Sequence, residues 1–129
     1  MEFKEKQSIY IQIADYVCEQ VMLDKWPENE RIPSVRDLAV LVEVNPNTVM
    51  KAYEFLQGKQ IIFNKRGVGY FASKEAKREI TIYRKERFLE TELPTFFKTL
   101  YLLDISIDDL KARYEKFIGE EYSSSTIKN

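Results

Sequence analysis

Residues 31–56 read RIPSVRDLAVLVEVNPNTVMKAYEFL, and this stretch decides the fold. Ser34 and Asp37 have the spacing of a capping box, which starts a helix by satisfying backbone amides that have no partner in the first turn. Asn45 followed by Pro46 is a second helix start, because asparagine caps well and proline loses no hydrogen bond at the first helical position. Apolar residues follow both starts at helical spacing. The pattern predicts two short helices joined by a tight turn.

Two short apolar runs follow the second predicted helix. Residues 61–63 and 70–71 are aliphatic and aromatic, a composition typical of strands. Residues 65–69 between them read KRGVG, and the two glycines permit the positive φ angles of a hairpin turn. Helix, turn, helix and hairpin in this order predict a winged helix-turn-helix, a fold that sets its second helix in the major groove of DNA.

The rest of the chain is predicted to be helical. Apolar residues recur at helical spacing in residues 8–25, 74–103 and 107–122, and Pro94 predicts a kink or a new start inside the middle segment. We therefore expect a mainly α protein with a small β wing. Its expected parts are a winged helix-turn-helix domain at residues 1–73, a short helical dimerisation segment at residues 74–122 and a flexible tail at residues 123–129.

The composition favours binding over catalysis. The 129 residues carry 20 Lys and Arg against 21 Asp and Glu, a net charge of -1 that is low for a DNA-binding protein. The basic residues nevertheless concentrate in residues 45–87, in and just after the second helix and hairpin. The chain has no His and one Cys, so it lacks the commonest general base and cannot form an internal disulfide. With no apolar run of membrane-spanning length and no secretory leader, we expect a cytoplasmic protein that binds no membrane.

Candidate DNA contacts lie on the face of the second helix that its core positions leave free. Short polar side chains at a helix start can reach phosphates or base edges, a methionine can contact a thymine methyl, and a lysine suits a phosphate. By this argument the reading face comprises Asn45, Asn47, Thr48, Met50 and Lys51. An alternative stays open, in which Asn45 and Thr48 only cap the helix and Lys51 is solvated.

Two further candidate sites are basic. Arg36 lies in the first turn of the preceding helix, where it opposes the helix dipole. A phosphate partner would explain this placement, and so would a salt bridge to Asp37 or Glu43. At the hairpin tip, Lys65 and Arg66 fit contact with the DNA backbone or the minor groove, where arginine meets a negative potential. An ordinary polar turn is the alternative there.

The run RIPSVRDLA…VNPNTVMKAYEFL…RGVGYF resembles the DNA-binding domain of the GntR family of bacterial transcription regulators. The match covers residues 8–72, and the short helical tail is similar to the YtrA-type subfamily, whose members lack a large effector-binding domain and dimerise through C-terminal helices. The resemblance implies that Ser34 is a cap that also faces phosphate and that a wing around Gly67 and Gly69 touches the minor groove. It further implies that the DNA is lined by Arg36, Asn45, Asn47, Thr48 and Lys51.

The helical tail is expected to form a homodimer. Two or three helices cannot readily enclose a drug-sized cavity, and their apolar stripes need cover. A second copy is the simplest cover and would give a twofold dimer. The alternative is that the stripes pack on the winged domain of the same chain. The expected interface residues are Ile80, Leu89, Leu93, Phe96, Phe97, Leu100, Leu110, Tyr114 and Phe117.

These features predict a sequence-specific regulator of transcription, a repressor that binds an inverted repeat in double-stranded DNA. The alternative function is a winged-helix module that binds a protein partner through Met50 and Phe55. No nucleophile–base pair, metal-ligand cluster or phosphate-binding loop stands out in the sequence. We therefore expect no enzyme activity, no metal site and no cofactor, and the sequence identifies no small-molecule effector.

Overall fold

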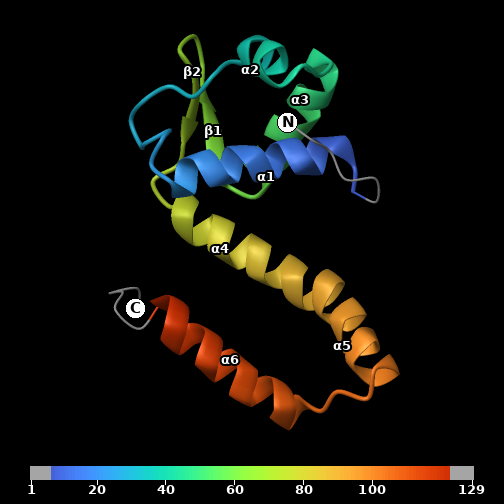
Figure 1. The fold of residues 1–129 in the computed structure, drawn as a ribbon. Coiled ribbons are helices and arrows are strands. Elements are labelled where there is room, and N and C mark those ends of the chain that lie inside the picture. Colours follow the sequence, from blue (N-terminus) through green and yellow to red (C-terminus); the bar gives the residue numbers. More distant parts are fainter. Residues whose placement is uncertain (1–6, 123–129) are drawn as a thin grey trace. The chain divides into compact units, whose positions relative to one another are not determined.

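The computed structural model describes residues 7–122, so the tail expected at residues 123–129 lies outside the described residues (Figure 1). The chain divides into two compact units, unit 1 (Met1–Lys85) and unit 2 (Glu86–Asn129). The elements in chain order are α1 (Ile9–Met22), α2 (Val35–Val42), α3 (Pro46–Gly58), β1 (Ile62–Lys65), β2 (Gly69–Ala72), α4 (Ala76–Arg87), a π-helical turn (Phe88–Glu92), α5 (Leu93–Leu102) and α6 (Ile107–Tyr122).

The helix-turn-helix consists of α2 and α3, and both predicted caps are present. The hydroxyl of Ser34 accepts a hydrogen bond of 3.0 Å from the amide of Asp37 at the start of α2. The side-chain oxygen of Asn45 accepts a hydrogen bond of 2.7 Å from the amide of Asn47 at the start of α3. Between the helices, Glu43 adopts a left-handed conformation with φ of 59°, which reverses the chain in a short turn.

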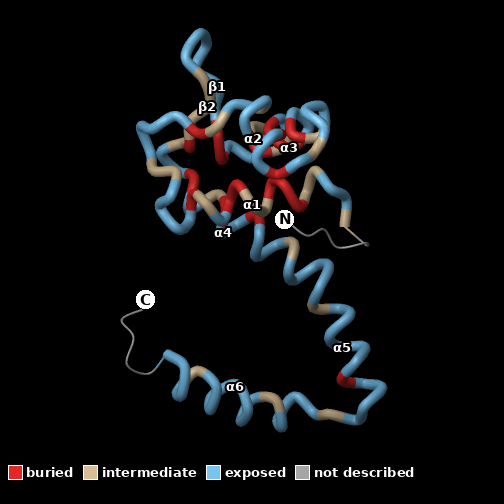
Figure 2. The backbone as a smooth tube through the Cα atoms, turned by 45° about the horizontal axis from the view of Figure 1, so that its top comes forward, coloured by how far each residue is buried: buried red, intermediate tan, exposed pale blue. Residues whose placement is uncertain are grey.

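A single apolar core holds unit 1 together. α3 packs against both α1 and α2, and buried positions of these three helices join others at the base of the wing and in α4 (Figure 2). Helical spacing explains the pattern, because each helix turns one apolar face inward and a polar face outward. The fully buried residues of these helices include Ile13, Val17, Leu38, Val49, Tyr53 and Leu56.

The wing is an antiparallel hairpin of β1 and β2. The pairing runs from Ile62 opposite Ala72 to Lys65 opposite Gly69. Gly67 in the turn has φ of 79°, so the turn uses the positive φ that glycine adopts without strain. The hairpin projects beyond the buried core of unit 1, and its tip is exposed (Figure 2).

Unit 1 extends past residue 73, where the sequence suggested the domain boundary. Ala76, Ile80 and Tyr83 of α4 are buried in the same core as the winged elements. Ile80, expected at a dimer interface, is 1% exposed and is therefore covered by its own chain. The first part of α4 thus completes the winged domain, because its apolar side chains fill the core that the hairpin and helices leave open.

Unit 2 contains the π-helical turn, α5 and α6. Pro94 lies at the start of α5, directly after the π-helical turn at Phe88–Glu92, so the helical path changes where the proline predicts. The amide of Asp109 donates a hydrogen bond of 3.0 Å to the hydroxyl of Ser106, which caps α6. Within the described part of unit 2, α5 and α6 make few contacts with each other.

Candidate nucleic-acid interface

The outer face of α3 presents most of the residues expected to read DNA. Asn47 and Lys51 are exposed, Met50 is 38% exposed, and Thr48 is half-buried. The opposite face of the same helix is buried in the core, so α3 is fixed on one side and accessible on the other. Such a helix can enter a groove without disturbing the fold.

The two asparagines at the start of α3 have separate duties. Asn45 uses its side-chain oxygen for the cap, as the structural alternative proposed. Asn47 contributes only its backbone amide to that cap, and its side chain is exposed. Because the Asn47 carboxamide carries one acceptor and two donor hydrogens, it is the residue at this end of α3 best suited to a base edge.

Lys51 lies over an aromatic ring of α1. Its ammonium nitrogen is 4.3 Å from the ring centroid of Tyr10, a cation–π distance. The contact gives the lysine a preferred position beside the first turn of α1. The sequence pattern gives no sign of this contact, because Tyr10 and Lys51 are far apart along the chain.

At the start of α2, Ser34 and Arg36 are both exposed. Ser34 uses its hydroxyl as a cap and keeps acceptor and donor capacity on its surface side. Among the ion pairs within the described residues, none joins Arg36 to Asp37 or Glu43. Arg36 therefore leaves its guanidinium exposed in the first turn of α2.

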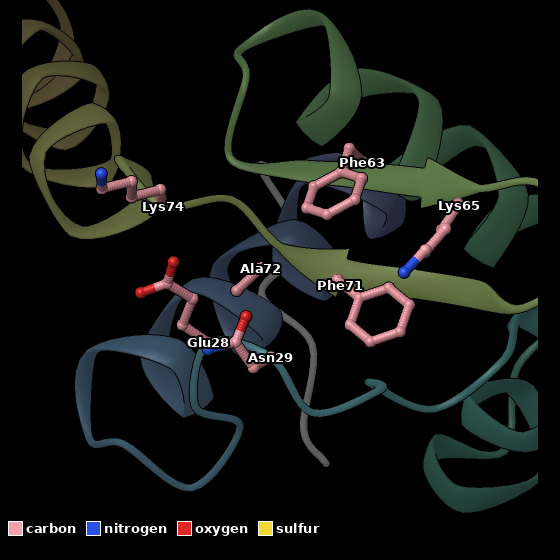
Figure 3. A pocket seen from close by; sticks show the side chains of 7 residues that line it. All are labelled: Glu28, Asn29, Phe63, Lys65, Phe71, Ala72 and Lys74. Atoms are coloured by element: carbon pink, nitrogen blue, oxygen red, sulfur yellow. The ribbon is translucent and has the colours of Figure 1, made fainter.

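The wing brings a second set of basic residues to the surface. Lys65, Arg66 and Gly67 are exposed, whereas Gly69 is half-buried. Lys65 does not extend from the tip, because its ammonium nitrogen lies 5.9 Å from the ring centroid of Phe71 on the outer face of the hairpin (Figure 3). Arg66 is thus the basic side chain best placed at the tip itself.

A shallow hollow of about 330 Å³ lies beside that outer face (Figure 3). Phe63 and Phe71 stack there with ring centroids 5.7 Å apart. Glu28 and Lys74 lie at its other end, so its walls carry both charges. The hollow lies between the wing and the loop after α1, and none of the candidate DNA-binding residues of α3 lines it.

Of the two residues proposed to anchor a protein partner, Phe55 is not available. Phe55 is half-buried, and its ring packs edge-on against Tyr10 at 5.9 Å and against Tyr83 at 5.3 Å between centroids. A side chain engaged on both sides by its own chain cannot insert into a partner. Of the two proposed anchors, Met50 is the one that remains accessible.

The dimerisation candidates of unit 2 differ in accessibility. Leu100 is 6% exposed, so its own chain covers it and it is not available to a second copy. Leu93 and Leu110 are half-buried. The candidates that remain 46–65% exposed are Leu89, Phe96, Phe97, Tyr114 and Phe117. These five side chains are the candidates that remain accessible to a second copy.

Within residues 7–122, no group of three or more His, Cys, Asp or Glu side chains is arranged to hold a metal ion. The described helices also include none with the length and apolar character needed to cross a bilayer.

Comparison with known proteins agrees with this geometry. The family model of bacterial regulatory proteins of the gntR family matches residues 9–71. A solved structure of a GntR-family transcriptional regulator from Bacteroides thetaiotaomicron is 46% identical, covers 89% of this chain and 100% of that one, and superposes with a TM-score of 0.76.

Two proteins of Bacillus subtilis extend the comparison. The transcriptional repressor YtrA is 41% identical over 69 residues, which are 54% of this chain and 53% of YtrA. The transcriptional regulator YhcF is 28% identical over 109 residues, which are 84% of this chain and 88% of YhcF. Together with the helix-turn-helix, the wing and the short helical tail, these likenesses identify the chain as a DNA-binding transcription regulator of the GntR family, and the similarity to YtrA supports its YtrA-type subfamily.

Proposed function

We propose that this protein is a cytoplasmic transcriptional repressor that binds an inverted-repeat operator as a homodimer. The observation that carries the proposal is the two-sided character of α3. Tyr53 and its buried neighbours anchor one face, while Asn47, Met50 and Lys51 are exposed on the other. YtrA, which is described as a repressor, is 41% identical over 69 residues.

In this proposal each subunit reads DNA through the first turns of α3. Asn47 pairs with a base edge in the major groove, and Met50 contacts a thymine methyl. Lys51 and Arg36 bind phosphates on either side of these contacts and set the register of the helix. Arg66 at the wing tip enters the adjacent minor groove, where its charge meets a concentrated negative potential.

The second copy is proposed to bind through α5 and α6. Both helices carry large apolar side chains that stay exposed within the described part of the chain. A twofold partner would remove this surface from water, and burial of apolar area is the main driving force of association. Two copies of α3 related by a twofold axis would favour two half-sites in inverted order. Occupancy of such an operator would block access to a promoter.

The decisive experiment selects duplexes from a random-sequence library with the purified full-length chain. We expect an enriched inverted repeat whose affinity falls steeply with added salt, because phosphate binding releases counterions. A palindromic consensus that binds one dimer would support the proposal. Enrichment of no sequence, with only weak salt-sensitive binding to all duplexes, would contradict a sequence-specific repressor.

A further inference from the structure

We propose that Arg31 is a positioning residue that clamps the wing in the place from which it reaches DNA. Arg31 lies just before α2, outside α3 and outside the hairpin turn. The inference rests on the proposed function in DNA binding and adds a residue that neither the sequence motif nor the exposed face of α3 indicates. We call the contact of Arg31 with Val68 and Gly69 the wing clamp.

The side chain of Arg31 reaches across the base of the wing turn. Its Nη1 atom donates a hydrogen bond of 3.0 Å to the carbonyl oxygen of Val68. On the way it passes directly over Gly69, where an added Cβ would lie 2.5 Å from Arg31 Cδ and 3.0 Å from Cγ. Only glycine leaves room for the arginine here, so the two residues depend on each other.

The backbone next to Arg31 is also joined to the wing. Arg31 forms a single antiparallel bridge with Phe71, and the amide of Ile32 donates a hydrogen bond of 2.9 Å to the carbonyl of Tyr70. These backbone contacts stop at residue 70. The Arg31 side chain continues the attachment to Val68, which lies closer to the tip.

The wing needs such an attachment because two short strands are marginally stable on their own. β1 and β2 have four residues each, and the last pair before the turn is Lys65 with Gly69. A hairpin of this size can pivot or fray at its tip unless another segment holds it. The wing clamp holds Val68, the last turn residue before β2 and one residue beyond the exposed Gly67.

The clamp also relates the wing to the reading helix. The segment that carries Arg31 continues to Pro33, whose carbonyl accepts a hydrogen bond of 2.7 Å from the Tyr53 hydroxyl of α3. A continuous set of contacts therefore runs from Val68 through Arg31 and Pro33 to α3. Its consequence is a defined separation between the wing tip and α3, which adjacent minor and major grooves require.

The first test uses the free protein. Amide hydrogen exchange of the wing residues should become about tenfold faster in Arg31→Ala than in wild type, as expected for loss of one hydrogen bond to a charged group. Lys25→Ala, which removes an equal charge from an exposed position after α1, should exchange like wild type. Because this measurement needs no DNA, unchanged wing exchange in Arg31→Ala would overturn the clamp whatever the protein binds.

The second test uses a duplex selected by the wild-type protein. Arg31→Ala should lose hydroxyl-radical protection at the outer, minor-groove positions and keep it at the central major-groove positions, with binding about tenfold weaker. Gly69→Ala should produce the same footprint, since its Cβ displaces the arginine, while the strain of alanine at φ of 140° acts with or without the arginine. In the Arg31→Ala background, Gly69→Ala should weaken binding by a smaller factor than in wild type, because the clash has been removed.

Equal factors in the two backgrounds would overturn the proposed dependence of Arg31 on Gly69. Loss of protection over the whole duplex in Arg31→Ala would overturn the positioning role, which predicts a loss confined to the wing contacts. If the wild-type protein selects no duplex while wing exchange still rises in Arg31→Ala, the clamp stands and the DNA-binding proposal fails.

Discussion

The hydroxyl of Tyr53 donates a 2.7 Å hydrogen bond to the carbonyl of Pro33 and so joins the middle of α3 to the segment that enters α2. Tyr53 is fully buried, and its ring meets Tyr70 of β2 edge-on with centroids 4.9 Å apart. The Tyr53 side chain of α3 therefore contacts both the segment before α2 and the wing. The relative placement of these three elements depends on it.

Replacing Tyr53 with phenylalanine should destabilise unit 1. The change keeps the ring and removes the hydroxyl, which leaves the Pro33 carbonyl without that donor. We expect the free energy of unfolding to fall by about 1 kcal/mol, the usual net value of one hydrogen bond. Urea denaturation measures the difference, and Tyr101→Phe is the control because Tyr101 is 85% exposed. Equal stabilities of wild type and Tyr53→Phe would show that the bond contributes nothing net.

The stability of the chain should also depend on Tyr53 at high pH. Burial raises the pKa of Tyr53, and nearby Tyr70 and Asp37 raise it further. A raised folded pKa favours the neutral phenol, so its contribution is fully present below the unfolded pKa of about 10 and is lost as pH rises towards the folded value. The stability advantage of wild type over Tyr53→Phe should therefore shrink above about pH 10. Denaturation of both proteins across this range tests it, and a constant difference would contradict the buried neutral phenol.

Removing the α3 cap should lower the stability of unit 1. Asn45→Ala deletes the oxygen that accepts the 2.7 Å hydrogen bond from the Asn47 amide. The expected loss is about 1 kcal/mol of unfolding free energy, and Asn45→Asp should retain most of the stability because aspartate also caps. Asn47→Ala is the matched control, since its side chain makes no part of the cap. Thermal denaturation of the three variants separates these outcomes.

Asn47 and Lys51 should affect DNA binding in different ways. Lys51→Ala should weaken binding to all duplexes alike and reduce the salt slope by about one, because a lysine–phosphate contact carries no sequence information. Asn47→Ala should reduce the preference for the selected sequence by roughly 1–3 kcal/mol, because a base-edge contact is lost. Fluorescence anisotropy with a selected and a scrambled duplex, across salt concentrations, distinguishes them. If both variants bind like wild type, the outer face of α3 does not bind the DNA.

The apolar surface of unit 2 should control the oligomeric state. Phe117 is 52% exposed on α6, and a charge there would have to be buried without a partner if the helix faces a second copy. We expect wild type to sediment as a dimer at micromolar concentration and Phe117→Glu to sediment as a monomer. Leu23→Glu is the matched control, because Leu23 is 56% exposed but lies in unit 1 directly after α1. A wild-type monomer under these conditions would contradict the proposed interface.

The sequence alone determined the elements whose signals are local. The Ser34 and Asn45 caps and the Gly67 turn each depend on residues a few positions apart, so spacing predicted them before any packing was known. Helical spacing likewise predicted the buried face of α3. The order of these elements was enough to predict the winged fold and which face of α3 stays exposed.

Only the tertiary structure decided how distant side chains meet. Ile80 lies in the core of unit 1, Lys51 lies over Tyr10, and Arg31 reaches Val68, 37 positions along the chain. An apolar residue at helical spacing can lie in a core or at an interface. A basic residue can face solvent, bind a phosphate or donate a hydrogen bond to a carbonyl. Local spacing cannot distinguish these because the choice depends on which segments the folded chain brings within a few ångströms of one another.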